Sequence, residues 1–270
     1  NPNRSGVYHP LMQDETTNHQ ERSPFSAPPP LNVPVAESLL LDINRVLGEL
    51  GIAFFLRHGT ALGAVRDHSV IPWDDDVDVG SIMGMHGLTP ERVVEAAEAL
   101  KSTGAEITLE TRGKGFYVAM MREDTRLDWN CYQVENGTIV QHPGIPIPIE
   151  MFVDLKPVSF LGETFLVPNP PERYFELKYG PNWRIPTSAG FEREAVLNVP
   201  GPETWSWRRR LLYRAKALLT PGLATKIRVL DGDGTRVQGA RVTVAGQPSG
   251  ASSADGVARV RVPTLRSYAI

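Results

Sequence analysis

The sequence predicts an α+β protein with a small β-sandwich-like module at its C-terminal end, and three observations lead to this prediction. Segments with the apolar spacing of helices are interspersed with short apolar runs typical of strands between residues 35 and 200. After residue 222 the pattern is that of short strands separated by Asp-Gly turns. Of the 270 residues, 41% are hydrophobic, which is enough to bury a core.

The composition excludes several classes of protein. Lys and Arg number 28 against 31 Asp and Glu, so the chain lacks the basic excess of a nucleic-acid binder. Cys131 is the single cysteine, which excludes an intrachain disulfide and a multi-cysteine zinc site. No apolar run approaches the ~20 residues of a membrane span. We expect a cytoplasmic protein, with membrane association left open because the chain does not begin with Met.

The elements follow in order after a polar, proline-rich tail over residues 1–34. A helix is predicted from the spacing of Leu39, Leu40, Ile43, Val46, Leu47 and Leu50, and it ends at Gly51. Ile52–Leu56 is predicted as a buried strand, and Thr89 caps a second helix that ends before Gly104. Further strands are predicted at 105–110, 116–121 and 149–155, then a hairpin over 158–167 and a helix from Asn169 to Tyr179.

The C-terminal part divides into residues 201–222 and residues 223–270. Trp205–Leu219 is a basic amphipathic stretch with two interpretations: peripheral contact with an anionic membrane, or a helix that packs Leu211 and Leu212 on the preceding domain. The composition slightly favours the second interpretation. Asp231–Thr235 is predicted as a hairpin turn rather than a calcium loop. The segment from Lys226 resembles the opening of a transthyretin-like β-sandwich and is short of a complete one.

Three aspartates carry the first chemical signal. In an extended strand Asp74, Asp76 and Asp78 would share one face, with Val77 and Val79 on the buried face. Crowded carboxylates repel one another unless a cation lies between them, and oxygen ligands suit Mg²⁺ or Mn²⁺. An aspartate-rich solvated loop is the competing interpretation, and the two are about equally weighted.

A glycine-containing turn carries the second signal. Gly59 and Thr60 follow the predicted strand and precede Gly63, so backbone N–H groups there can approach a phosphate. Arg66 adds a forked cation close to that turn. The segment therefore places hydrogen-bond donors for a phosphate close in sequence to a metal site. Phosphoryl or nucleotidyl transfer requires both.

These motifs resemble the signature of the LicD/fukutin-like phosphotransferase family. The resemblance covers about residues 36–200: the run Phe55–Asp78, then Phe152–Pro157, then Tyr179–Trp183. It implies a nucleotidyltransferase fold, a mixed sheet with flanking helices, over a catalytic domain at residues 35–200. His58 departs from the family, which usually has glycine there, and this leaves the donor open.

The resemblance also implies the roles of the site residues. Asp76 and Asp78 match the metal-binding pair, Asp154 matches a third acid on a later strand, and Asp74 is a further ligand or orienting group. Asp75 is expected to point to the other face. The implied reaction moves phosphocholine or a polyol phosphate from a CDP-linked donor to a glycan or lipid-linked glycan, with Mg²⁺ or Mn²⁺. The alternatives are transfer of the nucleoside monophosphate itself, or a non-catalytic glycan-binding scaffold.

Aromatic residues near these motifs are weighed in the same way. Trp73 is expected to anchor the acidic strand in the core rather than contact substrate. Trp183 and Tyr179 are assigned equally to core packing and to stacking on a base or choline group. Cys131 is expected to be inert.

Overall fold

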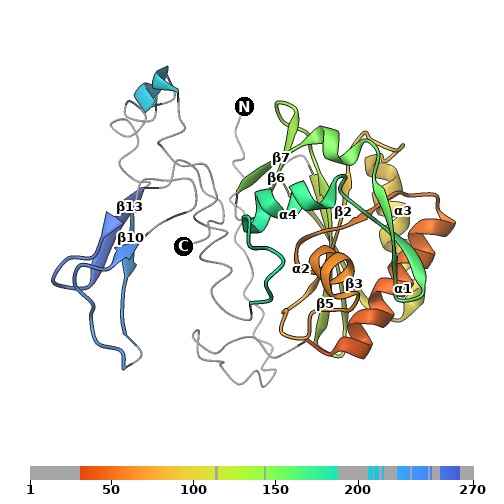
Figure 1. Ribbon diagram of the computed structural model, residues 1–270, viewed down its shortest axis with the longest axis horizontal. Coiled ribbons are helices and arrows are strands. Elements are labelled where there is room, and N and C mark those ends of the chain that lie inside the picture. The colour runs from red at the N-terminus through yellow and green to blue at the C-terminus, as the bar shows by residue number, and fades with distance from the viewer. Residues whose placement is uncertain are drawn as a thin grey trace, which may run out of the picture.

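The structure is a computed structural model that describes residues 31–112, 115–142 and 144–187, together with shorter stretches at 206–208, 210–212, 215, 224–231, 233–242, 244 and 250–261. The predicted tail before residue 31 and most of the basic stretch around Trp205 therefore lie outside the described residues. The described chain is a mixture of helices and strands (Figure 1). This confirms the α+β class.

A mixed five-stranded sheet forms the centre of the N-terminal domain. Its order is β1-β2-β5-β4-β3, and only the central pair β2 and β5 is parallel. The strands are β1 Phe55–Leu56, β2 Val77–Ile82, β3 Glu106–Arg112, β4 Gly115–Arg122 and β5 Thr125–Tyr132. Because β1 pairs with β2 only at Gly80 and Val79, the predicted strand 52–56 is shortened to two residues.

Two long helices cover one face of this sheet. α1 spans Val33–Glu49 and α3 spans Pro90–Leu100; they contact each other, and both contact the sheet strands (Figure 1). The periodic apolar residues that predict α1 form its buried face. At the start of α3, the backbone N–H of Arg92 donates to the Thr89 hydroxyl at 3.4 Å. Both helix predictions are confirmed, and α3 continues as a short 3-10 turn, η2 (Lys101–Thr103).

The core lies between these helices and the sheet. Along β2 the residues Val77 and Val79 are buried, and along β5 the same holds for Leu127, Trp129 and Cys131. The Trp129 indole N–H donates to the Ser81 hydroxyl at 3.0 Å, so the polar group of this large, fully buried side chain has a hydrogen-bond partner. The residues between them on both strands, including Asp78 and Asp128, therefore face away from this core.

Smaller elements follow the sheet. β6 (Thr138–Gln141) and β7 (Ile145–Pro148) form one hairpin, and β8 (Lys156–Phe160) and β9 (Glu163–Val167) form another. The helical elements here are short: η3 Ile149–Phe152 and α4 Pro171–Tyr179. The hairpin predicted over 158–167 is confirmed, and so is the end of α4 at Gly180. The N-cap of α4 is Pro170, not Asn169, and no side-chain hydrogen bond caps it.

The strand predicted at Ile149–Leu155 is wrong. Met151 and Phe152 are both buried, and the residues after them are exposed. Consecutive buried residues do not suit a strand that buries one face, because its side chains alternate. A 3-10 turn places both on the same side, and Phe152 there packs on Phe55 with 4.8 Å between ring centroids.

The C-terminal stretches contain the predicted short strands: β10 Ala224–Arg228, β11 Arg241–Val242, β12 Gly250–Ala251 and β13 Val257–Arg261. β10 pairs with β13 and β11 with β12. The N–H groups of Asp233 and Thr235 donate to the Asp231 carboxylate, and Leu230 bridges to Arg236, so the turn prediction is confirmed. The packing expected for Leu211 and Leu212 is absent, because they are 59% and 70% exposed.

Candidate active site

The site is built on the two parallel strands at the centre of the sheet. Asp78 on β2 lies directly opposite Asp128 on β5 in the strand register, so the two carboxylates project side by side. Carboxylate oxygens of Asp76, Asp78 and Asp128 all lie within 4.8 Å of one another. This is the arrangement of acids that holds a divalent cation with oxygen ligands.

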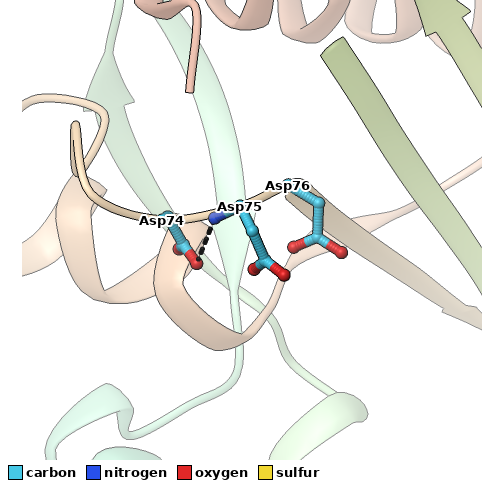
Figure 2. Close-up of side chains that lie close together, drawn as sticks. All are labelled: Asp74, Asp75 and Asp76. Carbon is cyan, nitrogen blue, oxygen red and sulfur yellow. Dashed lines mark hydrogen bonds between the residues drawn. The ribbon is translucent and has the colours of Figure 1, made fainter. Parts of the chain in front are cut away.

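A second group of acids adjoins the first. Asp74, Asp75 and Asp76 lie in the loop before β2, and their carboxylate oxygens are also within 4.8 Å of one another. Figure 2 shows the three side chains on the same side of the loop, with the Asp75 N–H donating to Asp74 Oδ1 at 3.2 Å. The expectation that Asp75 points away from the other acids is wrong, because the strand begins only at Val77 and alternation does not apply before it.

Gly59 makes room for this loop. A Cβ atom at that position would lie 1.8 Å from Asp74 Oδ2, a distance that no side chain could tolerate without moving the carboxylate. Gly59 lies in the helix α2 (His58–Leu62), which continues into the π-helical turn η1 (Gly63–Asp67), so the absence of a side chain at residue 59 leaves the Asp74 carboxylate its place against α2. The glycine that was assigned to phosphate binding also positions Asp74.

Each acid of the central pair has an arginine partner. Arg57, at the start of α2, forms an ion pair with Asp78 and donates from Nε to the Val79 carbonyl at 3.1 Å. Arg126, two residues before Asp128 on the same strand face, donates from Nε to Asp128 Oδ1 at 2.6 Å and from Nη2 to Oδ2. The Tyr117 hydroxyl from β4 donates to the same Oδ1 at 2.6 Å.

The electrostatics of the cluster favour a bound cation. Burial, and then the neighbouring Asp76 carboxylate, raise the pKa of Asp74 to about 7. Burial likewise raises the pKa of Asp76, followed by the effect of Asp78. Burial also raises the pKa of Asp78, although Arg57 opposes the shift. Carboxylates that resist ionisation in this way are stabilised by a positive ion placed between them.

The other predicted phosphate-binding residues have internal partners. The Thr60 hydroxyl accepts the backbone N–H of Asp78 at 2.8 Å, which ties α2 to the acidic strand. Arg66 forks onto Asp67 at 2.8 and 2.7 Å and donates to the Trp183 carbonyl at 3.2 Å. Its side chain is only 9% exposed, so these contacts favour a positioning role, and phosphate binding by Gly59, Thr60 and Arg66 stays a prediction.

Asp154 is not brought to this cluster. It lies exposed in the bend after η3, and it belongs to neither group of acids found among the described residues. Asp128 occupies the place expected for the third acid. The sequence contained the signal: Thr125–Tyr132 alternates buried and polar residues, and Leu127-Asp128-Trp129 has the same hydrophobic-Asp-hydrophobic form as the segment around Asp154.

The aromatic residues are sorted by their burial. Trp73 is 46% exposed, so the prediction that it anchors the core is wrong. The chain turns at Pro72, where the Asp74 N–H donates to the Ile71 carbonyl. Because of this turn, Ile71 is buried and Trp73 is not. Trp183 is buried against Phe175 with 4.8 Å between ring centroids, which favours core packing. Burial raises the pKa of the Cys131 thiol, in keeping with an inert residue.

His58 lies in a buried polar region, where the charged groups Arg57 and Lys178 act on it. Its backbone has φ 50°, and its N–H donates to the Tyr174 hydroxyl, which in turn donates to Gln141 Oε1 at 2.8 Å. Burial, followed by the positive charge of Lys178, lowers the pKa of the His58 imidazole well below its ordinary value. The ring is therefore neutral at physiological pH.

Comparison with known proteins agrees with the motifs. Residues 51–170 match the family model described as LicD/FKTN/FKRP, nucleotidyltransferase domain, which confirms the resemblance. The chain is 27% identical over 164 residues to human ribitol 5-phosphate transferase FKRP, covering 58% of this chain and 33% of that protein. It is 28% identical over 185 residues to human ribitol-5-phosphate transferase FKTN, covering 64% and 35%. The chain thus spans about a third of the length of these relatives.

Among solved structures, the solution structure of the antibiotic-resistance factor ANT(2'')-Ia aligns with a TM-score of 0.40 and 17% identity, over 70% of this chain and 97% of that one. Across the described residues of the present chain, no helix combines the length and apolar character that crossing a bilayer demands.

Proposed function

We propose that this chain, with its LicD/FKTN/FKRP-type domain over residues 51–170, transfers a phosphate-containing group from a CDP-linked donor to a hydroxyl of a glycan. The observation that carries the proposal is the meeting of Asp76, Asp78 and Asp128 at the parallel strand pair. The similarity to two ribitol-phosphate transferases supports a polyol phosphate as the transferred group.

The donor set of the site fits Mg²⁺ or Mn²⁺. Asp76, Asp78 and Asp128 offer carboxylate oxygens alone, and burial raises the pKa of the first two, so a hard divalent cation would relieve their repulsion. Held by these three carboxylates, such an ion would supply the positive charge that stabilises the donor phosphates and the leaving nucleotide. Asp74, held over Gly59, is placed to orient the same cluster.

The reaction balances as a displacement at phosphorus. The acceptor oxygen forms the new P–O bond, the bond to CMP breaks, and the hydroxyl proton is released. In this chain Arg57 fixes Asp78 through one oxygen and leaves the other carboxylate oxygen for the cation. Thr60 holds the backbone of Asp78 in register, so the acids are oriented before the donor arrives.

The test is a transfer assay with Mg²⁺ and a panel of CDP-linked donors, in which both CMP release and the acceptor product are measured. Release of CMP together with a phosphate-containing product supports the proposal. Attachment of CMP to the acceptor would instead show nucleotidyl transfer. Binding of glycan without turnover for any donor would favour a non-catalytic scaffold.

Variants in the same assay test the metal ligands. Asp76→Asn, Asp78→Asn and Asp128→Asn should each abolish turnover while the folded state persists, because the amide keeps the shape and removes the charge. Asp154→Asn should retain turnover, since that residue lies outside the cluster. Loss of activity in Asp154→Asn, with Asp128→Asn active, would return the third position to Asp154. A lipid-linked acceptor, membrane contact and a cytoplasmic location stay predictions.

A further inference from the structure

Asp128 and its arginine partner differ sharply in exposure. The Asp128 side chain is 7% exposed, whereas the Arg126 side chain that forks onto it is 46% exposed. The guanidinium therefore reaches a buried carboxylate from the solvent side. Arg126 Nη2 also donates to the Tyr117 hydroxyl at 2.7 Å, and its Cζ lies 5.8 Å from the centre of the tyrosine ring.

The second arginine of the site is held quite differently. Arg57 has a side chain only 6% exposed, and besides Asp78 it is tied to the Val79 carbonyl of the same strand. A guanidinium buried in this way, with a backbone partner, is a fixed part of the fold. Arg126 contacts a carboxylate and a hydroxyl at the edge of solvent, and it can exchange these partners at little cost in desolvation.

Arg126 and a divalent cation compete for the same carboxylate. Both oxygens of Asp128 accept hydrogen bonds from the Arg126 fork, and one also accepts from Tyr117. A cation at the Asp76, Asp78 and Asp128 cluster would add two positive charges within reach of this guanidinium. A phosphate group offers the same paired oxygens as a carboxylate, so the fork that leaves Asp128 finds an equivalent partner on the donor.

We propose that Arg126 is an exchangeable cation of the active site: it holds Asp128 when no metal is bound, and it transfers its fork to a donor phosphate when metal and donor bind together. This inference rests on the proposed function and assigns a donor-binding role to a residue outside the sequence motifs. It predicts that Arg126 acts in opposite directions on the two ligands. It should oppose the binding of metal alone and favour the binding of the nucleotide in the presence of metal.

The test measures two affinities without turnover. Binding of Mn²⁺ alone is followed by the electron paramagnetic resonance signal of free Mn²⁺, and binding of CDP at saturating Mn²⁺ is followed by calorimetry. Arg126→Gln should bind Mn²⁺ more tightly than the wild type, and should lose CDP affinity by about tenfold or more, the loss expected for one charge-assisted hydrogen bond. Arg126→Lys keeps the positive charge but loses the paired N–H groups of the guanidinium. Its affinity for CDP should therefore lie between those of the wild type and Arg126→Gln.

A matched control lies in the same hairpin. Arg122 donates to the Asp42 carboxylate, the Ser38 hydroxyl and the Thr103 carbonyl, away from the acidic cluster. Arg122→Gln removes an arginine of the same hairpin that also binds a carboxylate, although its side chain is 20% exposed against 46% for Arg126, and it should change neither affinity. Circular dichroism of each variant confirms that the fold persists during the measurements.

Two outcomes would overturn the inference. If Arg126→Gln binds Mn²⁺ more weakly and CDP unchanged, the residue only orients Asp128. If both affinities equal those of the wild type, Arg126 has no role toward either ligand, and the proposed function stands unaffected. A wild-type protein that binds neither Mn²⁺ nor CDP contradicts the proposed function itself, and this inference with it.

Discussion

Asp74 is the residue whose environment gives the clearest dependence on pH. Its pKa is raised to about 7 in the folded protein, against about 3.9 in an unfolded chain. The folded state therefore holds a proton that the unfolded state has lost between these values. Its contribution to stability is complete below pH 4 and is lost as the pH rises through 7.

Replacing Asp74 with asparagine should remove this penalty. In buffer with a chelator, the wild type should lose stability as the pH rises from 5 to 7, whereas Asp74→Asn should not. The free energy of unfolding of the variant minus that of the wild type should therefore increase by up to about 1.4 kcal/mol per pH unit. Urea titrations at several pH values measure the difference. Asp124→Asn, in the turn between β4 and β5, serves as the control. Parallel stability curves for Asp74→Asn and the wild type would contradict the raised pKa.

Arg66 gives a second prediction for a single residue. Because its guanidinium forks onto Asp67 and reaches the Trp183 carbonyl, Arg66→Lys should destabilise the protein without any donor by about 1–3 kcal/mol. Thermal unfolding with and without CDP measures this. A variant whose stability is unchanged alone, but which CDP no longer stabilises, would restore the phosphate-binding role.

The sequence predicted the acids of the first motif and missed the residues that complete them. Asp76 and Asp78 are adjacent in one motif, so local spacing was sufficient. Asp128, Arg126 and Tyr117 join them only through strand pairing, and the parallel register of β2 with β5 is a long-range property. Asp154 was chosen because its segment resembled a family motif, although Leu127-Asp128-Trp129 has the same form.

Among the elements, the link between α2 and β2 determines where the acids lie. The Thr60 hydroxyl on the short helix accepts a hydrogen bond from the backbone N–H of Asp78, the second residue of β2. Thr60→Val keeps the shape and leaves this N–H without its partner, which should cost about 1–3 kcal/mol of stability. Mn²⁺ affinity should fall as well, since Asp78 is less firmly placed.

The conservative change separates the hydroxyl from the methyl group. Thr60→Ser retains the acceptor and should recover most of both the stability and the Mn²⁺ affinity. Chemical denaturation and Mn²⁺ titration of the two variants provide the comparison. Equal losses in Thr60→Ser and Thr60→Val would assign the effect to packing, because Thr60 is buried.

Elements with local signals were predicted best. The spacing of apolar residues predicts α1 and α3. Thr89, Gly51 and Gly104 mark helix ends, and each lies within one turn of the end that it marks. The sequence analysis does not predict β5, although its residues alternate, and it predicts a strand where η3 forms. In η3 the apolar run Met151-Phe152 fits either structure, and only its packing on Phe55 and the preceding hairpin decides between them.

At the scale of the whole molecule, the described fold begins with α1. Ala36 donates its N–H to the Asn32 carbonyl at 2.9 Å, and Ala36, Leu39 and Leu40 are fully buried. Because residues 1–30 are a polar, proline-rich segment that is expected to bury little apolar surface, a protein without them should melt within about 2 °C of the complete chain. Calorimetry of the two proteins measures this, and a truncation that also removes residues 31–40 should lower the melting temperature strongly.

The two-sided sheet has a consequence for any survey of substitutions across this chain. In the first half of β2 and the middle of β5, the odd-numbered Val77, Val79, Leu127 and Trp129 fill the core, whereas the even-numbered Asp78, Arg126 and Asp128 lie on the opposite face at the acidic cluster. Substitutions at odd positions should reduce the amount of protein that accumulates in cells. Those at Asp78, Arg126 and Asp128 should change abundance less and reduce catalysis more. Over residues 77–79 and 126–129, a plot of abundance against position would then oscillate with a period of two, and a plot of activity corrected for abundance would oscillate in the opposite phase.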